Sequence, residues 1–280
     1  TDLTSSVPAG AKGSRISSVA ASAVDVSIAY ISIDAHREGN YAPLVYRTAD
    51  AGKTWTSIAA NLPAESPVKV VREDSKNPKV LYVGTEFGLW TTVDGGRSWF
   101  KRGALPTVTV DDIVMQERDR DLVVATHGRS LYIIDDVSPL EALTPEVRAD
   151  SVHLFAPRPA LGFVTVAGFG DSNGNAVFRG ENPPEGALLT FWLKSFAAQP
   201  VKISITNSEH QPVANLTAPA IAGLNRVTWD LHTTKDLRTE YGGDADKPVA
   251  AGEYTVTLTA NGQTSVQKLM VSYVPGVDTR

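Results

Sequence analysis

Three ionisable residues stand directly after short apolar runs that have the character of β-strands. Asp34 follows residues 29–33, Glu86 follows residues 81–85, and His127 follows residues 122–126. Two carboxylates in one cleft can act as general acid and general base, so Asp34 and Glu86 are candidates for catalysis. Plain polar lining is the simpler alternative, because strands end at water.

The loop after Asp34 is longer than its counterpart after Glu86. Asp50 lies 16 positions after Asp34, whereas Asp94 lies only eight positions after Glu86. Insertions in repeat proteins often build the binding face. Three residues of this loop, His36, Arg37 and Tyr41, therefore join Asp34, Glu86 and His127 as candidates for ligand contact, together with Arg129, which follows His127 by two positions.

The elements that would position these residues are repeated. Residues 47–55 and 91–99 share the pattern Asp-x-Gly-x-Thr/Ser-Trp, and their aspartates lie 44 residues apart, near the roughly 40–50 residues of a four-stranded propeller blade. A third copy at 110–134 has the strands but lacks the Gly and Trp. We therefore predict about three blades within residues 1–150, the last of them incomplete.

The shared pattern is a turn signal rather than a reactive site. An Asp side chain can accept hydrogen bonds from nearby backbone amides, glycine supplies a positive φ, and tryptophan supplies an apolar face. We predict structural roles for both copies, which comprise Asp50, Gly52, Thr54 and Trp55 in the first and Asp94, Gly96, Ser98 and Trp99 in the second.

The pattern changes after residue 150. Residues 151–184 are rich in Gly, Pro and Asn and are predicted to form an irregular connector. Six or seven short alternating strands follow, with a hairpin signal at Asn261-Gly262. We predict an immunoglobulin-like β-sandwich at residues 185–280.

The two Asp-x-Gly-x-Thr/Ser-Trp segments and the strand at 81–85 resemble the BNR/Asp-box repeats of sialidases, sortilin/Vps10 ectodomains and some propeller glycoside hydrolases. Residues 30–137 look like bacterial secreted proteins of this kind, which commonly end in an immunoglobulin-like domain. The resemblance implies that the loops after Asp34, Glu86 and His127 line the ligand face. The arginine triad of sialidases cannot be assigned, because only Arg37 and Arg129 are candidates.

Composition narrows the partners. A net charge of −5 without a Lys/Arg run argues against nucleic acid, and no apolar run is long enough to span a bilayer. The chain has no cysteine, and no His/carboxylate spacing forms a recognisable metal site, so we expect neither metal nor cofactor. By resemblance we expect an extracellular or periplasmic protein, with a signal peptide outside this sequence.

Three functions stay open at this stage. The first is binding of a glycan or protein ligand on the face formed by the loops after the second strands. The second is glycoside hydrolysis, with an active site shared with further blades, and the third is a structural or assembly role. In each case we expect the rest of the propeller to come from an N-terminal segment or from another chain.

Overall fold

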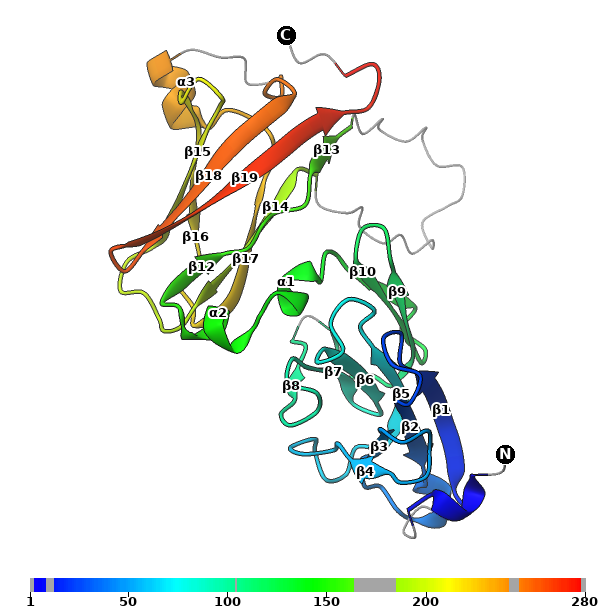
Figure 1. The fold of residues 1–280 in the computed structure, drawn as a ribbon. Helices are drawn as coiled ribbons and strands as arrows, with labels where there is room; N and C mark the ends of the chain where they lie inside the picture. The colour runs from blue at the N-terminus through cyan, green and yellow to red at the C-terminus, as the bar shows by residue number, and fades with distance from the viewer. Residues whose placement is uncertain (1–2, 9–12, 104, 164–184, 242–246, 278–280) are drawn as a thin grey trace. The chain divides into compact units, whose positions relative to one another are not determined.

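The computed structural model describes residues 3–8, 13–103, 105–163, 185–241 and 247–277. The chain divides into two compact units, of which one ends at Leu143 and the other begins at Thr144 (Figure 1). The predicted all-β fold class is confirmed: blades of an incomplete β-propeller are followed by an immunoglobulin-like β-sandwich. No helix among the described residues is long and apolar enough to cross a membrane.

The first unit contains three antiparallel sheets in which each strand pairs with the next along the chain. The first blade consists of β1 (Arg15–Ala21), β2 (Ala29–Asp34), β3 (Leu44–Thr48) and β4 (Thr56–Ser57). The second consists of β5 (Val68–Glu73), β6 (Leu81–Thr85), β7 (Gly88–Thr92) and β8 (Phe100–Lys101). The third sheet contains β9 (Val110–Gln116), β10 (Asp121–Thr126) and β11 (Leu131–Ile134), and thus lacks a fourth strand in the described part of the chain.

The inner two strands of every blade share one irregularity. The pairs β1–β2, β5–β6 and β9–β10 each shift register near the end of the second strand. The extra residues of these β-bulges are Ser17, Lys69 and Asp111. A bulge interrupts the alternation of side chains and re-aims the extra one. The bulge recurs at the same place in all three blades, beside the C-terminal ends of β2, β6 and β10.

The two Asp-x-Gly turns have the hydrogen bonds that their residue types predict. Asp50 Oδ1 accepts from Thr54 N at 2.9 Å, and Asp50 Oδ2 accepts from Thr54 Oγ1 at 2.6 Å. Thr48 Oγ1 accepts from Gly52 N at 2.9 Å, and Gly52 has a φ of 85° that favours glycine. The second turn repeats these bonds: Asp94 Oδ1 accepts from Ser98 N and from Thr92 Oγ1, and Thr92 Oγ1 accepts from Gly96 N.

Each blade has a front face toward the following blade and a back face toward the preceding one. Tyr30 and Val45 on the front of the first blade belong to one core cluster with Val71 on the back of the second. Trp99 of the second blade closes this interface, because its Nε1 donates to the carbonyl oxygen of Ile58 at 2.7 Å. Apolar packing of front against back therefore joins neighbouring blades.

A buried ion cluster ties the second and third blades to the short helix that follows them, α1 (Ser138–Glu141). Arg120 donates from Nη2 to Asp74 Oδ2 at 2.8 Å and from Nε to Glu141 Oε1 at 2.7 Å. Its Nη1 donates to Ser75 Oγ and to Glu117. The side chain of Asp74 is fully buried, so Arg120 neutralises a charge that water does not reach.

The second unit is a sandwich of a three-stranded and a five-stranded sheet, with orders β12-β14-β17 and β13-β19-β18-β15-β16. Its strands are β12 (Val152–Leu154), β13 (Ala160–Gly162), β14 (Ala187–Leu193), β15 (Val201–Thr206), β16 (Pro212–Ala218), β17 (Gly223–Trp229), β18 (Gly252–Ala260) and β19 (Gln263–Tyr273). Leu189, Phe191 and Trp229 from one sheet and Val256 and Leu269 from the other share one core. The predicted hairpin at Asn261-Gly262 joins β18 to β19, and both turn residues have positive φ.

The structure differs from the predicted connector at its start. Residues 152–154 form β12, which pairs with β14, and residues 160–162 form β13, which lies parallel to β19. Both are strands of the sandwich, so these residues do not belong to an irregular connector; the part of the predicted segment at 164–184 lies outside the described residues. The sequence hides these strands because each is only three residues long and is held by partners far along the chain.

Short helices complete the chain. Two of them, α1 and α2 (Pro145–Ala149), follow the third sheet, and the second is capped by Thr144, whose side chain accepts from Val147 N. The helix α3 (Lys235–Tyr241) was not predicted. One 3₁₀ turn, η1 (Thr4–Ser6), precedes the first blade, and another, η3 (His36–Glu38), lies within its long loop between β2 and β3.

Candidate ligand-binding site

Two of the three predicted strand exits meet through a lysine. Asp34 ends β2 and Glu86 directly follows β6. Lys69 Nζ donates to Asp34 Oδ2 at 2.7 Å and lies 2.9 Å from Glu86 Oε2. Lys69 is the bulge residue of β5, and the bulge places its ammonium group between the carboxylates of neighbouring blades.

Asp34 also orients a histidine. His36 Nδ1 lies 2.6 Å from Asp34 Oδ1, and the His36 backbone N–H donates to the same oxygen at 3.3 Å. Because the ionised carboxylate accepts, Nδ1 carries the proton and Nε2 is the ring atom available to a ligand. The turn η3 holds His36 here, and it ends at Gly39 with a φ of 76°. Asp34 itself is 6% exposed and thus serves as a buried anchor.

His36, Lys69 and Glu86 border a cavity of about 500 Å³. Its walls include His36, Tyr41, Glu65, Lys69, Glu86 and Phe87. The aromatic side chains of Tyr41 and Phe87 are exposed, at 54% and 47%. An open cavity with two aromatic rings and several charged groups has the usual make-up of a site for a polar ligand.

The contact between Lys69 and Asp34 keeps both side chains charged. Burial alone acts to raise the pKa of Asp34, but hydrogen bonds from Lys69 and His36 outweigh it and hold that pKa below its ordinary value. Burial likewise acts to lower the pKa of Lys69, whereas its bonds to Asp34 and Glu86 raise it above the ordinary value. Asp34 and Lys69 are therefore both charged at neutral pH.

The other predicted residues do not join this cavity. His127 Nδ1 lies 3.2 Å from Asp111 Oδ2, the bulge residue of its own blade, and its side chain is 81% exposed. Arg37 and Arg129 are exposed and are not among the residues that line the cavity. Thr109 connects the third blade to the site, because its Oγ1 donates to Glu86 Oε1 at 3.2 Å.

Sequence reasoning missed Lys69, Glu65 and Phe87. The signal for Lys69 was present: a lysine within the run Val68-Lys69-Val70-Val71 breaks a strand pattern that is otherwise buried. Phe87 is the residue after Glu86, so the strand-exit alignment stopped one residue short. Among the described residues, no group of three or more His, Asp or Glu side chains is arranged to hold a metal ion.

The Asp-x-Gly turns lie at the other end of the blades. Thr48, just before Asp50, pairs with Ala29 at the start of β2, whereas Asp34 ends that strand. Five residues of strand separate the two ends, which is roughly 17 Å. Hydrogen bonds from the Thr54 side chain and backbone lower the pKa of Asp50 to about 2, so it is a permanently ionised turn residue.

An all-β chain of propeller blades and a sandwich, with a cavity at the strand exits, is thus the class that fold and site define. No protein-family model matches the sequence, and no curated protein matches it either. Among solved structures the chain is similar to a GH74 xyloglucanase from Xanthomonas campestris, with 16% identity over 96% of this chain and 49% of that one and a TM-score of 0.39.

Two further structures are similar. An ancestral GH74 enzyme shares 15% identity over 91% of this chain and 31% of its own, with a TM-score of 0.37. The BSP domain of a biofilm-associated protein shares 11% over 92% of this chain and 29% of its own, with a TM-score of 0.25. The chain spans about half, or less, of the length of these structures. Similarity at this level carries no argument about activity.

Proposed function

We propose that this chain is the ligand-binding part of a secreted propeller protein and that it binds a glycan in the cavity at the strand exits. One observation carries the proposal: the exposed rings of Tyr41 and Phe87 share a cavity with the charged groups of Lys69 and Glu86. Sugar rings have apolar C–H faces that pack on aromatic side chains, and hydroxyl rims that bond to carboxylates and ammonium groups.

The charges in and around the cavity favour an uncharged glycan. The carboxylates of Asp34 and Glu86 pair with one ammonium group, that of Lys69, and Glu65 adds a third carboxylate to the cavity wall. An acidic sugar would meet a net negative site and would have to be desolvated there. Neutral sugars avoid this repulsion, since their hydroxyl groups donate to the carboxylates and accept from Lys69.

Hydrolysis is the weaker alternative. Contacts of 2.7 and 2.9 Å to one nitrogen keep Asp34 and Glu86 close, a spacing compatible with the roughly 5–5.5 Å of a retaining glycosidase. Such an enzyme needs one carboxyl group protonated as the general acid, whereas hydrogen bonds from Lys69 and His36 hold the pKa of Asp34 below its ordinary value and keep it ionised. Binding needs no such acid.

The test is titration calorimetry of the chain with a panel of neutral and acidic oligosaccharides. We expect binding of at least one neutral oligosaccharide, weakened about tenfold or more by Tyr41→Ala or Phe87→Ala, which is the 1.4 kcal/mol of a lost ring contact. The matched control is Phe196→Ala, which removes an exposed ring of the sandwich and should leave affinity unchanged.

Three results would count against the proposal. Absence of binding to every neutral glycan would reject it. So would an affinity of Tyr41→Ala and Phe87→Ala equal to that of the wild type. Release of reducing ends by the chain, abolished by Glu86→Gln, would favour hydrolysis instead. A protein ligand is the remaining alternative, and in that case no oligosaccharide of the panel would bind.

A further inference from the structure

The back face of the first blade is exposed where the back faces of the other blades are buried. Register places Val19 of β1 in the position of Val71 in β5 and Ile113 in β9. Val71 and Ile113 are 0% and 1% exposed, because the preceding blade covers them, whereas Val19 is 67% exposed. The neighbouring Ile16 is 46% exposed.

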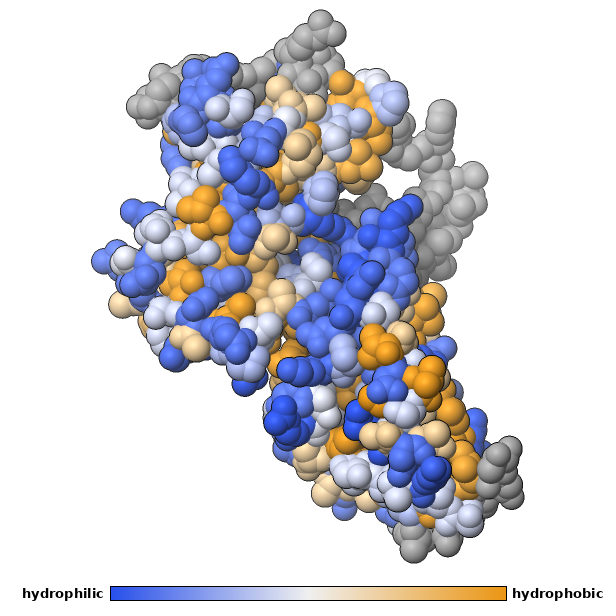
Figure 2. All heavy atoms as spheres, viewed as in Figure 1, coloured by the Kyte–Doolittle hydropathy of each residue, from blue (hydrophilic) through white to orange (hydrophobic). Residues whose placement is uncertain are grey.

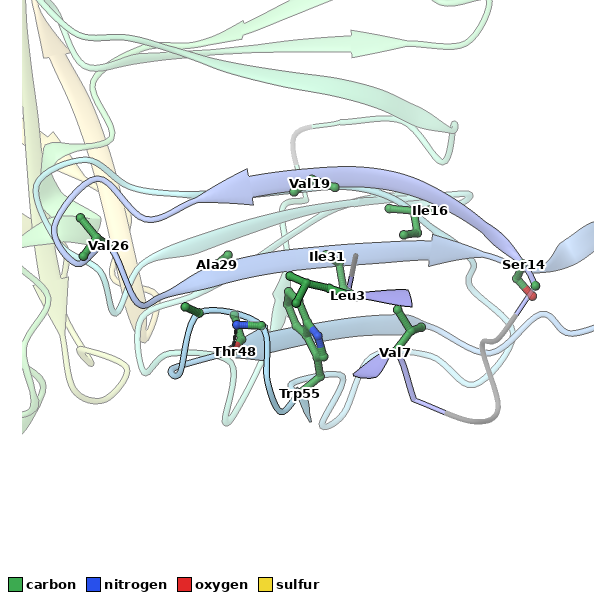
Figure 3. Close-up of a pocket in the computed structure, with 13 residues that line it drawn as sticks. Leu3, Val7, Ser14, Ile16, Val19, Val26, Ala29, Ile31, Thr48 and Trp55 are labelled. Carbon is green, nitrogen blue, oxygen red and sulfur yellow. Dashed lines mark hydrogen bonds between the residues drawn. The ribbon is translucent and has the colours of Figure 1, made fainter. Parts of the chain in front are cut away.

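This face holds an apolar hollow. The space-filling view shows apolar surface along the β1 side of this unit (Figure 2). A cavity of about 510 Å³ lies between β1, β2 and the first Asp-x-Gly turn, and Figure 3 shows the side chains of Ile16, Val19, Ile31 and Trp55 around it. Large exposed apolar patches mark interaction sites in soluble proteins.

Residues 3–7 lie on part of this face, and their sequence resembles that of a later segment of the chain. Their sequence, Leu-Thr-Ser-Ser-Val before Pro8, aligns with Ile-Ala-Ala-Asn-Leu at 58–62 before Pro63. The second segment closes the first blade and lies on the Asp-x-Gly turn of the second. The first segment lies in the same way on the Asp-x-Gly turn of the first blade.

The two segments make the same apolar contact with the turn glycine. A Cβ on Gly52 would lie 2.6 Å from Leu3, and a Cβ on Gly96 would lie 2.8 Å from Ile58. Both pairs show the same close approach of an apolar side chain to the turn glycine, which therefore has no room for a Cβ.

Each segment also binds the tryptophan of its turn, through different atoms: Trp99 Nε1 donates to the carbonyl oxygen of Ile58 at 2.7 Å. Trp55 Nε1 donates to Ser6 Oγ at 3.3 Å, and Ser6 Oγ donates to the carbonyl oxygen of Gly52 at 2.6 Å. At the aligned position, Asn61 Nδ2 donates to the carbonyl oxygen of Trp99 at 2.9 Å. Residues 3–7 therefore hold the position of a blade's closing segment, without the sheet that goes with it.

We propose that the back face of the first blade is a docking surface for a further blade of this repeat, whose closing segment is residues 3–7. Its front face would present large apolar side chains at the positions of Tyr30 and Val45, which fill this role between the first and second blades. Such a blade would cover Val19, Ile16 and Trp55 and fill the hollow beside them. The proposal does not depend on the ligand of the strand-exit cavity.

The absence of cysteine from the chain makes a direct test possible. A copy of residues 15–57 is inserted directly before Leu3, so that its last strand continues into residues 3–7 as β4 continues into 58–62. A second extended chain carries a copy of residues 68–101 at the same place. In each chain Val19→Cys in the original first blade is labelled with a maleimide under native conditions, and its rate is measured.

We expect fast labelling of Val19→Cys in the original chain and labelling at least tenfold slower in at least one extended chain. The control is Val266→Cys, an exposed position on β19 of the sandwich, whose rate should not change. Equal rates of Val19→Cys in the original chain and in both extended chains would overturn the proposal. So would protection of Val19→Cys in the original chain that increases with protein concentration, because the occupant would then be a second copy.

Discussion

At the scale of single residues, the candidate site depends on Lys69. Asp34 and Glu86 would repel each other across the boundary of two blades without it, and Asp34 would be a buried charge without a cation. In the proposed function the same ammonium group disfavours acid catalysis by Asp34 and supplies a donor for a ligand. The proposed function and local stability are therefore coupled at one side chain.

Replacement of Lys69 by methionine tests this coupling. We expect Lys69→Met to lower the free energy of unfolding at pH 7 by about 1–2 kcal/mol, a value discounted because the cavity is open to water. Urea denaturation of the variant and the wild type measures it. A change below about 0.3 kcal/mol would show that the pair contributes nothing.

The pH dependence follows from the direction of the shift. The pKa of Asp34 is depressed in the folded state, so its contribution is fully present above the unfolded pKa of about 4 and is lost as pH falls through the folded value. The wild type should therefore lose stability between pH 5 and about 2 more steeply than Lys69→Met. Parallel profiles of unfolding free energy against pH would contradict this.

At the scale of elements, the Asp-x-Gly turns have unequal packing. Trp99 is 3% exposed and bonds to Ile58 of the preceding blade, whereas Trp55 is only partly buried and meets residues 3–7. The same turn thus closes a complete interface in one blade and a partial one in the other.

Alanine substitutions should reveal the difference. We expect Trp99→Ala to cost about 3–5 kcal/mol, the usual cost of removing a buried Trp, and Trp55→Ala less than half of that. Both values come from urea unfolding followed by intrinsic fluorescence or circular dichroism. Equal losses would mean that the burial of Trp99 against the preceding blade adds nothing.

The ion cluster around Arg120 is a second element-scale feature. Arg120→Ala leaves the fully buried Asp74 without its cation, and we expect a loss of about 3–5 kcal/mol. Arg118→Ala is the matched control: its side chain is 83% exposed and pairs with Asp119 at the surface, so its unfolding midpoint should stay close to that of the wild type. Comparable unfolding midpoints for both variants would contradict the structural role of the cluster.

At the scale of the whole molecule, the second unit has its own core and its own strands. β12 and β13 belong to it, so a fragment of residues 144–280 contains the full sandwich, whereas residues 185–275 lack one strand from each sheet. We expect fragment 144–280 to unfold cooperatively with a higher midpoint than fragment 185–275. Thermal melts measured by circular dichroism compare the two, and equal midpoints would show that β12 and β13 contribute nothing to the fold.

In the first unit, unlike the sandwich, two sheet faces expose large apolar side chains. Val114, Leu131 and Ile133 on the front of the third blade are 56–64% exposed, as is Val19 on the back of the first, at 67%. A stack of repeats buries its core only where a neighbour covers each face. Among the described residues, both terminal faces are apolar sheet surfaces, whereas the two inner interfaces are covered on both sides.

Local chemistry alone determined much of this protein. The bonds of Asp50 and Asp94 span four residues, the hairpin at Asn261-Gly262 spans two, and the blade spacing follows from their recurrence, so no distant contact was needed to predict them. The alignment of strand exits also placed Asp34 and Glu86 near each other. These features depend on residues that are neighbours in the chain.

Only the tertiary structure decided the rest. Lys69 meets Asp34 across 35 positions because a bulge turns it toward the neighbouring blade, and β13 meets β19 across more than a hundred. His127 followed the same strand-exit rule, yet it pairs with Asp111 instead of joining the cavity. Strand register and packing between separate segments determine these contacts. The contacts therefore cannot be predicted from residues that are neighbours in the chain.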